Sequence, residues 1–299
     1  LPQFHSFGFT VLTVLPLMIG AKVVYTARFI PRKIVELVRE HRPRLFVGVP
    51  SMYRALLSVK DAGPEDFKSV TLPVSGGERL PDAVHDNVKE KFGMDILEGY
   101  GLTETAPTTH TYTPRARKPH SVGKPLPRVK HLIVDDHDRP VPPGESGEIL
   151  LAGPNIMAGY FKLPEQTRQV FVEINGTHWF RSGDIGHTDE DNFLFITGRK
   201  KEMLIIGGEN VFPREIEEVL DKHEAVSASA VIGKEDESRG EVAIAFVEIN
   251  EGHDFDEAAL RKWCREELAQ YKVPREVHRV DELPRTPTGK IMRRELSAD

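Results

Sequence analysis

The sequence has little cysteine and no long run of basic residues. Its 299 residues contain one cysteine, Cys264, so a disulfide within the chain is excluded and a reducing, cytoplasmic setting is indicated. Forty Lys and Arg stand against 46 Asp and Glu, and the formal net charge of −6 gives no support to nucleic-acid binding. The sequence also has no Walker A loop, no Gly-x-Gly-x-x-Gly after a predicted strand, no His-Glu-x-x-His and no paired-cysteine metal motif.

Long hydrophobic runs are also scarce. The one extended apolar stretch, residues 7–21, is interrupted by Pro16 and Gly20, is shorter than the roughly 20 residues of a membrane-spanning helix, and follows no basic leader. We therefore expect a core helix that runs into a strand over 21–25. Because the chain opens with Leu1 inside such an element, we expect it to be a fragment.

The single cysteine and the one glycosylation sequon both have structural interpretations. Leu260, Trp263, Cys264 and Leu268 share one face of a predicted helix, which favours a buried, structural thiol. The sequon that begins at Asn175 is interpreted as a plain turn, because nothing else in the sequence indicates secretion.

Composition and length are those of a soluble globular protein with about two domains: 39% of residues are hydrophobic and 29% charged. Over the first 121 residues, helices beginning at 31 and spanning 81–92 alternate with strands at 45–49, 70–74 and 96–97. This alternation predicts an α/β layer with a parallel sheet. Two of the strands end in glycine turns, where such sheets bind ligands.

The pattern changes near residue 122. Short alternating runs at 131–134, 147–151 and 192–196, separated by Pro, Gly and Asp, predict a small antiparallel β subdomain. After Lys201 the pattern becomes α+β, with helices at 213–220 and 256–271 and strands at 228–232 and 242–249. We therefore place a domain boundary near Lys201.

Eight motifs occur in a fixed order along the chain. They are Phe4-His5-Ser6-Phe7-Gly8, Ser75-Gly76-Gly77-Glu78, Gly99-Tyr100-Gly101-Leu102-Thr103-Glu104, Tyr160 after Gly153-Pro154-Asn155, Trp179-Phe180-Arg181-Ser182-Gly183-Asp184, Gly198-Arg199-Lys200-Lys201-Glu202, Gly207-Gly208-Glu209-Asn210-Val211-Phe212-Pro213 with Glu215-Ile216-Glu217, and Pro284-Arg285-Thr286-Pro287-Thr288-Gly289-Lys290. Together they resemble the adenylate-forming superfamily of acyl-CoA synthetases, peptide-synthetase adenylation domains and beetle luciferases.

The resemblance implies a fold and a two-step reaction. The fold is the carboxy-terminal part of a large α/β plus β-barrel domain, followed by a small mobile α+β domain. Residues 1–121 would be the α/β subdomain, 122–198 the β subdomain, and 199–299 the mobile domain, with its hinge at Lys201. In the reaction a carboxylate attacks the α-phosphate of ATP, giving an acyl-adenylate and pyrophosphate, and the thiol of CoA then displaces AMP. ATP, Mg²⁺ and CoA are the implied cofactors.

The resemblance also assigns roles to individual residues. Lys290, Thr103, Glu104 and His5 would be catalytic. Lys290 would neutralise charge as two anions meet, and Glu104 would be the Mg²⁺ ligand. The implied nucleotide site comprises Gly77, Glu78, Gly99, Tyr100, Gly101, Thr103, Asp184, Arg199 and Lys290. Gly207 and Gly208 would admit the thiol arm. Without the resemblance, these residues would be interpreted as turns, core side chains and surface charges.

The implied acid is a medium- or long-chain fatty acid, because the first motif resembles long-chain acyl-CoA and acyl-carrier-protein synthetases and lacks the aspartate of amino-acid-activating domains. Two alternatives stay open: an acyl-carrier-protein ligase, and a non-catalytic or split fragment that binds nucleotide and acyl group only. The fragment alternative rests on the family's phosphate loop, which this sequence does not contain and which would precede Leu1. We expect no nucleic-acid partner, and leave peripheral contact with the inner membrane face and a dimer open.

Overall fold

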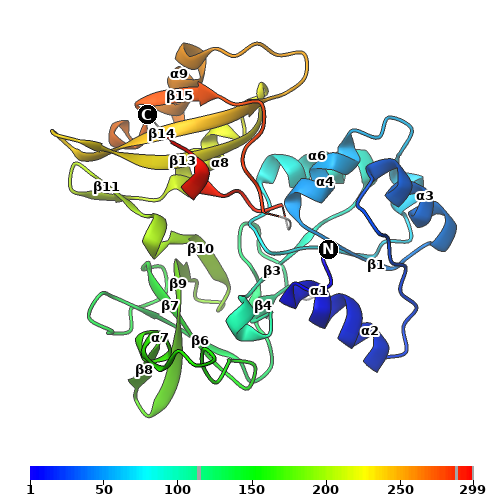
Figure 1. Cartoon of the computed structure of the whole chain (residues 1–299), viewed down its shortest axis with the longest axis horizontal. Helices are drawn as coiled ribbons and strands as arrows, with labels where there is room; N and C mark the ends of the chain where they lie inside the picture. The colour runs from blue at the N-terminus through cyan, green and yellow to red at the C-terminus, as the bar shows by residue number, and fades with distance from the viewer. Residues whose placement is uncertain (113–115, 287–288, 298–299) are drawn as a thin grey trace. The chain divides into compact units, whose positions relative to one another are not determined.

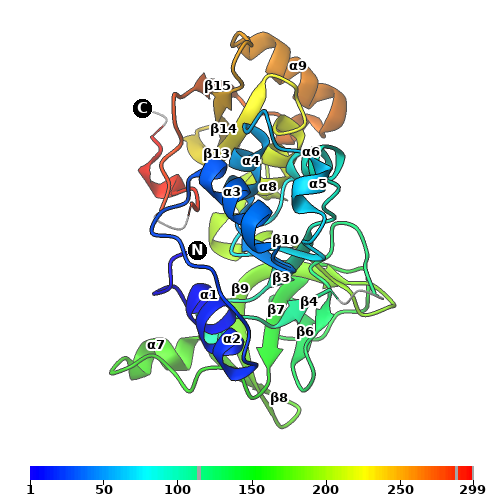
Figure 2. The same cartoon turned by 90° about the vertical axis from the view of Figure 1, so that its right-hand side faces the viewer.

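The computed structural model describes residues 1–112, 116–286 and 289–297, and the chain divides into two compact units. The first unit comprises Leu1–Ser182 and Gly186–Ile196, and the second comprises Gly183–Ile185 and Thr197–Asp299. The division crosses two long strands, β9 (Thr177–Thr188) and β10 (Leu194–Arg199), which begin in the first unit. Figures 1 and 2 show the elements of each unit.

The first unit opens with a helical segment that is not the core helix expected from the sequence. It consists of α1 (Ser6–Phe9), a π-helical stretch (Thr10–Val14) and α2 (Leu15–Met18), in which only Gly8 and Pro16 are buried. Phe9, Leu15, Leu17 and Met18 are exposed. The strand expected at 21–25 is also absent, because no strand of the described chain pairs with this stretch.

A mixed α/β layer follows, as the sequence predicts. Its helices are α3 (Pro31–His41), α4 (Pro50–Leu57), α5 (Pro64–Phe67) and α6 (Asp82–Phe92). The sheet order is β1 (Leu45–Gly48), β2 (Leu72–Ser75), β3 (Leu97–Tyr100), β4 (His110–Thr111) and β5 (Lys124–Pro125). The first three strands are parallel and the last two antiparallel. Tyr53, Leu56, Phe67 and Phe92 fill the core between the helices and the sheet.

The second sheet is the antiparallel region predicted after residue 122. Its remaining strands are β6 (Lys130–Val134), β7 (Gly147–Ala152) and β8 (Phe171–Ile174), and the order is β10-β9-β7-β6 with β8 paired to β9. The ladders β6–β7 and β8–β9 are antiparallel. Asn175 and Gly176 form the β8–β9 turn with φ angles of 51° and 70°, so the sequon lies in the tight turn expected. Helix α7 (Pro164–Gln169) precedes β8.

The second unit packs two helices on one sheet. Strands β11 (Leu204–Ile206), β12 (Glu209–Val211), β13 (Val226–Asp236) and β14 (Gly240–Ile249) have the order β12-β11-β14-β13, and β15 (Glu276–Arg279) runs parallel to β14. The helices are α8 (Pro213–Leu220) and α9 (Glu257–Glu267). Cys264 is buried in the core, which confirms the structural interpretation of this thiol.

Short 3-10 turns complete the chain at Thr103–Thr105, Lys200–Glu202, Gln270–Lys272 and Arg293–Glu295. Within the described ranges, every helix is too short or too polar to cross a lipid bilayer.

Candidate active site

Two of the predicted glycine turns lie at the same edge of the first sheet. Strands β2 and β3 are parallel neighbours with Ser75 and Glu98 in register, so the turns after both strands leave from adjacent carboxyl ends. Glu98 connects them, because its Oε2 atom accepts a hydrogen bond from the Leu80 amide at 3.1 Å. Gly77 has a φ of 86°, which favours glycine. This edge is where ligands bind in parallel α/β sheets.

The first motif packs onto this edge. A Cβ atom on Gly76 would lie 2.8 Å from the ring of Phe7, so only glycine allows the ring this close. The Ser6 and Thr103 hydroxyl oxygens are 3.2 Å apart. His5 caps α1, because its Nδ1 accepts from the Phe7 amide at 3.3 Å. The structure therefore gathers three separate motifs, and the catalytic role assigned to His5 stays a prediction.

Tyr100 and its flanking glycines lie at the end of β3, in the segment that leads to Thr103. The Tyr100 carbonyl accepts from the Thr109 amide at 2.8 Å and the Thr109 hydroxyl at 3.1 Å. A Cβ atom on Gly101 would stand 1.9 Å from the Pro107 carbonyl oxygen, so no other residue fits there without rearrangement. Gly99 lies within β3, opposite Thr111. The Tyr100 ring packs on the apolar cluster of the second sheet.

The Glu104 side chain is hydrogen-bonded to Tyr160, a motif residue to which the sequence analysis assigned no role. The Tyr160 hydroxyl donates to Glu104 Oε1 at 2.9 Å, and burial together with this carboxylate raises the pKa of Tyr160 to about 12. Thr103, next to Glu104, is exposed.

The predicted Mg²⁺ site rests on one carboxylate. No group of three or more His, Cys, Asp or Glu side chains within the described ranges could hold a metal ion by itself. A lone carboxylate suits Mg²⁺, which is usually held through one or two carboxylates together with substrate phosphates. Glu104 therefore fits the implied metal.

His110 packs beside Tyr100 and against His131, and the sequence analysis singled out neither histidine. The Nε2 atom of His110 is 2.7 Å from Nδ1 of His131, and the rings stack at 5.0 Å. His131 Nε2 lies 2.8 Å from Oδ1 of Asn192. Burial, with a smaller contribution from His131, lowers the pKa of His110 to about 3, so His110 is neutral at physiological pH.

In the second unit, Asp184 and Arg199 form an ion pair. Arg199 Nε donates to Asp184 Oδ1 at 2.8 Å, and the Asp184 side chain is only 6% exposed. The structure thus brings together two residues of the implied nucleotide site. Lys201, the assigned hinge, is exposed in the 3-10 turn that follows β10.

Gly207 and Gly208 form the two-residue turn of the β11–β12 hairpin. Their φ angles are 62° and 87°, the left-handed values that such turns require. A Cβ atom on either residue would meet nothing within 4 Å. Backbone conformation accounts for the glycines, and the open space leaves room for a narrow ligand. The Gly207 amide donates to the Arg239 carbonyl at 2.7 Å.

Lys290 is joined to Thr286 by two hydrogen bonds, which connect the two ends of one loop. The Thr286 amide donates to the Lys290 carbonyl at 2.8 Å, and the Lys290 amide donates to the Thr286 hydroxyl at 3.1 Å. Gly289 has a φ of 93°. Pro287 and Thr288 of the same motif lie outside the described residues.

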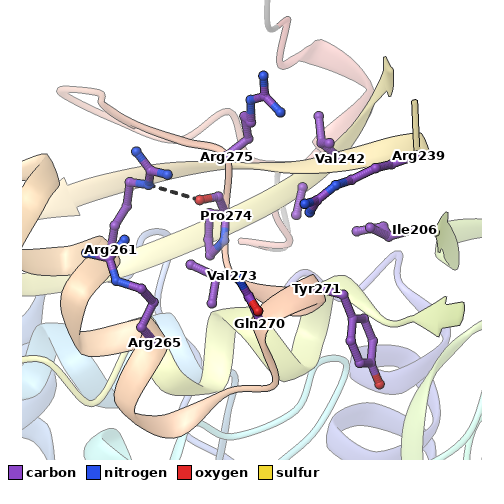
Figure 3. Close-up of a pocket in the computed structure, with 11 residues that line it drawn as sticks. Ile206, Arg239, Val242, Arg261, Arg265, Gln270, Tyr271, Val273, Pro274 and Arg275 are labelled. Atoms are coloured by element: carbon purple, nitrogen blue, oxygen red, sulfur yellow. Dashed lines mark hydrogen bonds between the residues drawn. The ribbon is translucent and has the colours of Figure 1, made fainter. Parts of the chain in front are cut away.

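An arginine-lined pocket of about 290 Å³ lies beside the Gly207 turn (Figure 3). Arg239 precedes β14, Arg261 and Arg265 are one turn apart on α9, and Arg275 precedes β15. Arg261 is fixed by a bond from Nε to the Pro274 carbonyl at 3.1 Å. Among the residues that the structure describes, the side chains of Arg239 and Arg265 have no ion-pair partner. Two unpaired guanidinium groups at one pocket favour an anionic ligand.

Comparison with known proteins identifies the family of this chain. The family model described as AMP-binding enzyme matches residues 1–161, and the model described as AMP-binding enzyme C-terminal domain matches residues 215–290. A long-chain-fatty-acid–CoA ligase of Bacillus subtilis (strain 168) is 36% identical over 297 residues, which is 99% of this chain and 52% of that protein. The chain therefore spans about half the length of this relative.

Other relatives have different names. A 2-succinylbenzoate–CoA ligase of Geobacillus kaustophilus is 38% identical over 99% of this chain and 59% of its own length. A fatty acid–[acyl-carrier-protein] ligase, ScoC of Streptomyces coeruleorubidus, is 35% identical over 93% of this chain and 54% of its own length. The crystal structure of ATP-bound MatB from Rhodopseudomonas palustris superposes with a TM-score of 0.92 at 33% identity, covering 98% of this chain and 58% of MatB. Because the family model covers more than half of the chain, the chain belongs to the AMP-binding enzymes, the adenylate-forming family that its motifs resemble.

Proposed function

We propose that the protein carrying this chain converts a medium- or long-chain fatty acid first into an acyl-adenylate, with ATP, and then into a thioester of CoA. The observation that carries the proposal is the convergence of three motifs at the carboxyl ends of β2 and β3. There Ser6 lies 3.2 Å from Thr103, and Phe7 packs against Gly76.

The first unit supplies groups suited to adenine and the α-phosphate. Tyr100 offers an aromatic face on which a base can stack, and the exposed Thr103 hydroxyl can donate to a phosphate oxygen. The Glu104 carboxylate is the hard oxygen ligand that Mg²⁺ requires. When bound, this ion would supply positive charge at the phosphates.

The second unit supplies groups for the ribose and for the meeting of two anions. Asp184, fixed by Arg199, can accept hydrogen bonds from both ribose hydroxyls. Lys290 is a compact cation on a flexible stem, suited to neutralising charge when a carboxylate approaches the α-phosphate. We propose Lys201 as the hinge about which residues 199–299 move relative to subdomains 1–121 and 122–198.

The arginine pocket supports CoA as the acceptor. CoA carries a diphosphate and a further phosphate at one end of a narrow arm that ends in the thiol. Arg239 bonds through its carbonyl to Gly207, so the pocket and the predicted thiol path are adjacent within one unit. Phosphates in the pocket would leave the arm free to follow the turn at Gly207 and Gly208.

This assignment is tested by comparing CoA with pantetheine, which has the thiol arm and no phosphate. Replacing Arg265 by Gln should raise KM for CoA about ten- to a hundredfold, the value of one charged hydrogen bond, and leave KM for pantetheine unchanged. Lys262→Gln, one helical turn away on α9 and exposed, is the control. An equal rise in KM for CoA and for pantetheine would contradict phosphate binding by Arg265.

Transfer to an acyl carrier protein is the second candidate, favoured by the similarity to ScoC. Thioester formation with CoA and with a carrier protein, compared at equal concentration, decides between the two. A fragment that only binds nucleotide and acyl group is tested by acid-dependent exchange of pyrophosphate into ATP. The exchange activity of residues 1–299 is compared with that of a longer protein that contains them, and a hydroxylamine trap over a series of acids identifies the substrate.

A further inference from the structure

The turn that carries Thr103 and Glu104 is bound by one segment of chain from far along the sequence. Asn155 donates through Nδ2 to the carbonyls of Thr105 at 2.8 Å and Thr108 at 3.1 Å. The Met157 amide donates to the Glu104 carbonyl at 2.8 Å. Three hydrogen bonds therefore fix the backbone of the turn.

The same segment also reaches the Glu104 side chain, through Tyr160. The Tyr160 hydroxyl lies 2.9 Å from Oε1 of Glu104. The backbone of Tyr160 is itself fixed, because its amide donates to the Thr167 hydroxyl at 2.9 Å. Gly159 adopts a φ of 149°, and a Cβ atom there would stand 2.7 Å from Thr167 Cγ2. The backbone at Gly159 and Tyr160 is therefore held by Thr167, and this fixes the position of the phenol beside Glu104.

A phenol is a suitable partner for a carboxylate that must bind a cation. It donates one hydrogen bond and carries no charge, so it restricts the rotation of the carboxylate without neutralising it. A lysine or arginine at this place would compete with the cation. The bond to Oε1 leaves Oε2 available, on a side chain next to the exposed Thr103.

We propose that Tyr160 is a positioning residue that holds the Glu104 carboxylate for a divalent cation at the phosphates of the nucleotide. The proposal rests on the proposed function, which assigns that cation to Glu104. Partners of metal-binding carboxylates typically contribute ten- to a hundredfold in metal affinity. Because Tyr160 acts through Glu104 in this proposal, its loss should weaken the metal site and spare the metal-independent contacts.

The test is Tyr160→Phe in the complete protein, with Mn²⁺ as the probe. Electron paramagnetic resonance measures Mn²⁺ binding in the presence of ATP, and calorimetry measures AMP binding without metal. We expect Mn²⁺ affinity to fall about ten- to a hundredfold and AMP affinity to change less than twofold. In turnover, the Mg²⁺ concentration for half-maximal rate should rise by the same factor, while kcat at saturating Mg²⁺ stays near wild type.

Two further variants separate positioning from general loosening. Tyr112→Phe also removes a phenol that donates to backbone carbonyls, those of Lys118 and Ser121, and should leave Mn²⁺ affinity unchanged. Asn155→Ala loosens the backbone of the turn and should weaken AMP and Mn²⁺ together.

Comparing Glu104→Gln with Tyr160→Phe separates the metal role of Glu104 from the positioning role of Tyr160. Should Glu104→Gln abolish Mn²⁺ binding while Tyr160→Phe has no effect, the positioning role is wrong and the metal role of Glu104 stands. Should Glu104→Gln itself leave Mn²⁺ binding intact, the assignment of the cation to Glu104 is wrong. A Tyr160→Phe variant that loses AMP and Mn²⁺ affinity in equal measure would show a purely structural role and overturn the proposal.

Discussion

The Nε atom of Arg199 lies 2.8 Å from Oδ1 of Asp184, and this ion pair fixes a carboxylate that is almost wholly buried. A carboxylate held in one orientation can discriminate between ligands with and without a pair of hydroxyl groups. The pair therefore offers a direct test of ribose recognition.

We expect Asp184→Ala to weaken AMP binding about ten- to a hundredfold, because hydrogen bonds to a charged group contribute about 1.5–3 kcal/mol. The variant should also lose its preference for AMP over 2′,3′-dideoxy-AMP, since the hydroxyls would have no acceptor. Calorimetry with both nucleotides measures the two effects. A preference that survives the substitution would place the ribose elsewhere.

The ion pair between Arg293 and the buried Glu217 should stabilise the second unit. Arg293 donates through Nη2 to both carboxylate oxygens of Glu217, at 3.0 and 2.7 Å, and through Nε at 3.1 Å, and Glu217 also accepts from the Val231 amide at 2.8 Å. Arg293→Ala would leave a buried carboxylate without its cation, which typically costs about 3–5 kcal/mol. Urea unfolding followed by tryptophan fluorescence, in a Trp179→Phe background that leaves Trp263 as the reporter, measures the change.

Lys262→Ala is the matched control for that experiment. Lys262 pairs with Glu266 at 3.9 Å on the surface of the same unit, with side chains 73% and 58% exposed. Exposed pairs contribute about 0–1 kcal/mol. Equal effects of the two substitutions would contradict the importance of the buried pair.

The His110–His131 pair should make the first unit sensitive to acid. The pKa of His110 is lowered to about 3 in the folded chain, whereas an unperturbed histidine has a pKa of about 6.5. Between these values the unfolded chain binds a proton that the folded chain does not, so stability is complete above about pH 6.5 and falls as the pH decreases. At pH 5 the loss should be about 2 kcal/mol.

His110→Gln should flatten this dependence, at the cost of some stability at neutral pH. His110 faces His131, the Thr109 hydroxyl and the Tyr100 ring, so His131→Gln should flatten it in part. His137→Gln, at an exposed position in the same unit, should leave it unchanged. Thermal unfolding followed between pH 7 and pH 5 gives the slopes, and an unaltered slope in His110→Gln would assign the effect to another group.

The periodicity of the sequence predicted most of the elements, and its failures have physical causes. Helix α8, strands β13 and β14 and the buried Cys264 follow from local pattern alone. The strand expected at 21–25 is absent from the structure. A strand forms only where a second strand pairs with it, and a local sequence pattern does not show whether such a partner exists. Helix α4 is not among the elements expected from the sequence, although its first residue, Pro50, suits the first turn of a helix.

The site was predictable only in part, and for a similar reason. The resemblance of eight motifs supplied the candidate residues, but it could not show which of them touch. Tyr160 and Glu104 are 56 residues apart, and their hydrogen bond follows from the fold. The four arginines that line the pocket come from three separate segments, none of which is unusual in sequence.

Gly208 tests the path proposed for the thiol. Tryptophan at this position would fill the open space beside the hairpin turn, at a strain of about 1–3 kcal/mol from the left-handed backbone. Gly208→Trp should therefore keep pyrophosphate exchange and lose thioester formation from a preformed acyl-adenylate by tenfold or more. Gly208→Ala carries the same strain without the bulk and should retain both. Normal thioester formation with tryptophan present would contradict the path.

The central claim is that Lys290 neutralises charge when the carboxylate meets the α-phosphate, and one pair of measurements on Lys290→Ala in the complete protein tests it most directly. Acid-dependent exchange of pyrophosphate into ATP should fall by a factor of roughly 10²–10³, the typical effect of removing one preorganised charge-stabilising group. Thioester formation from a preformed acyl-adenylate should continue at the wild-type rate, because attack by the thiol does not join two anions. Exchange that persists, or an equal loss of both half-reactions, would contradict the account.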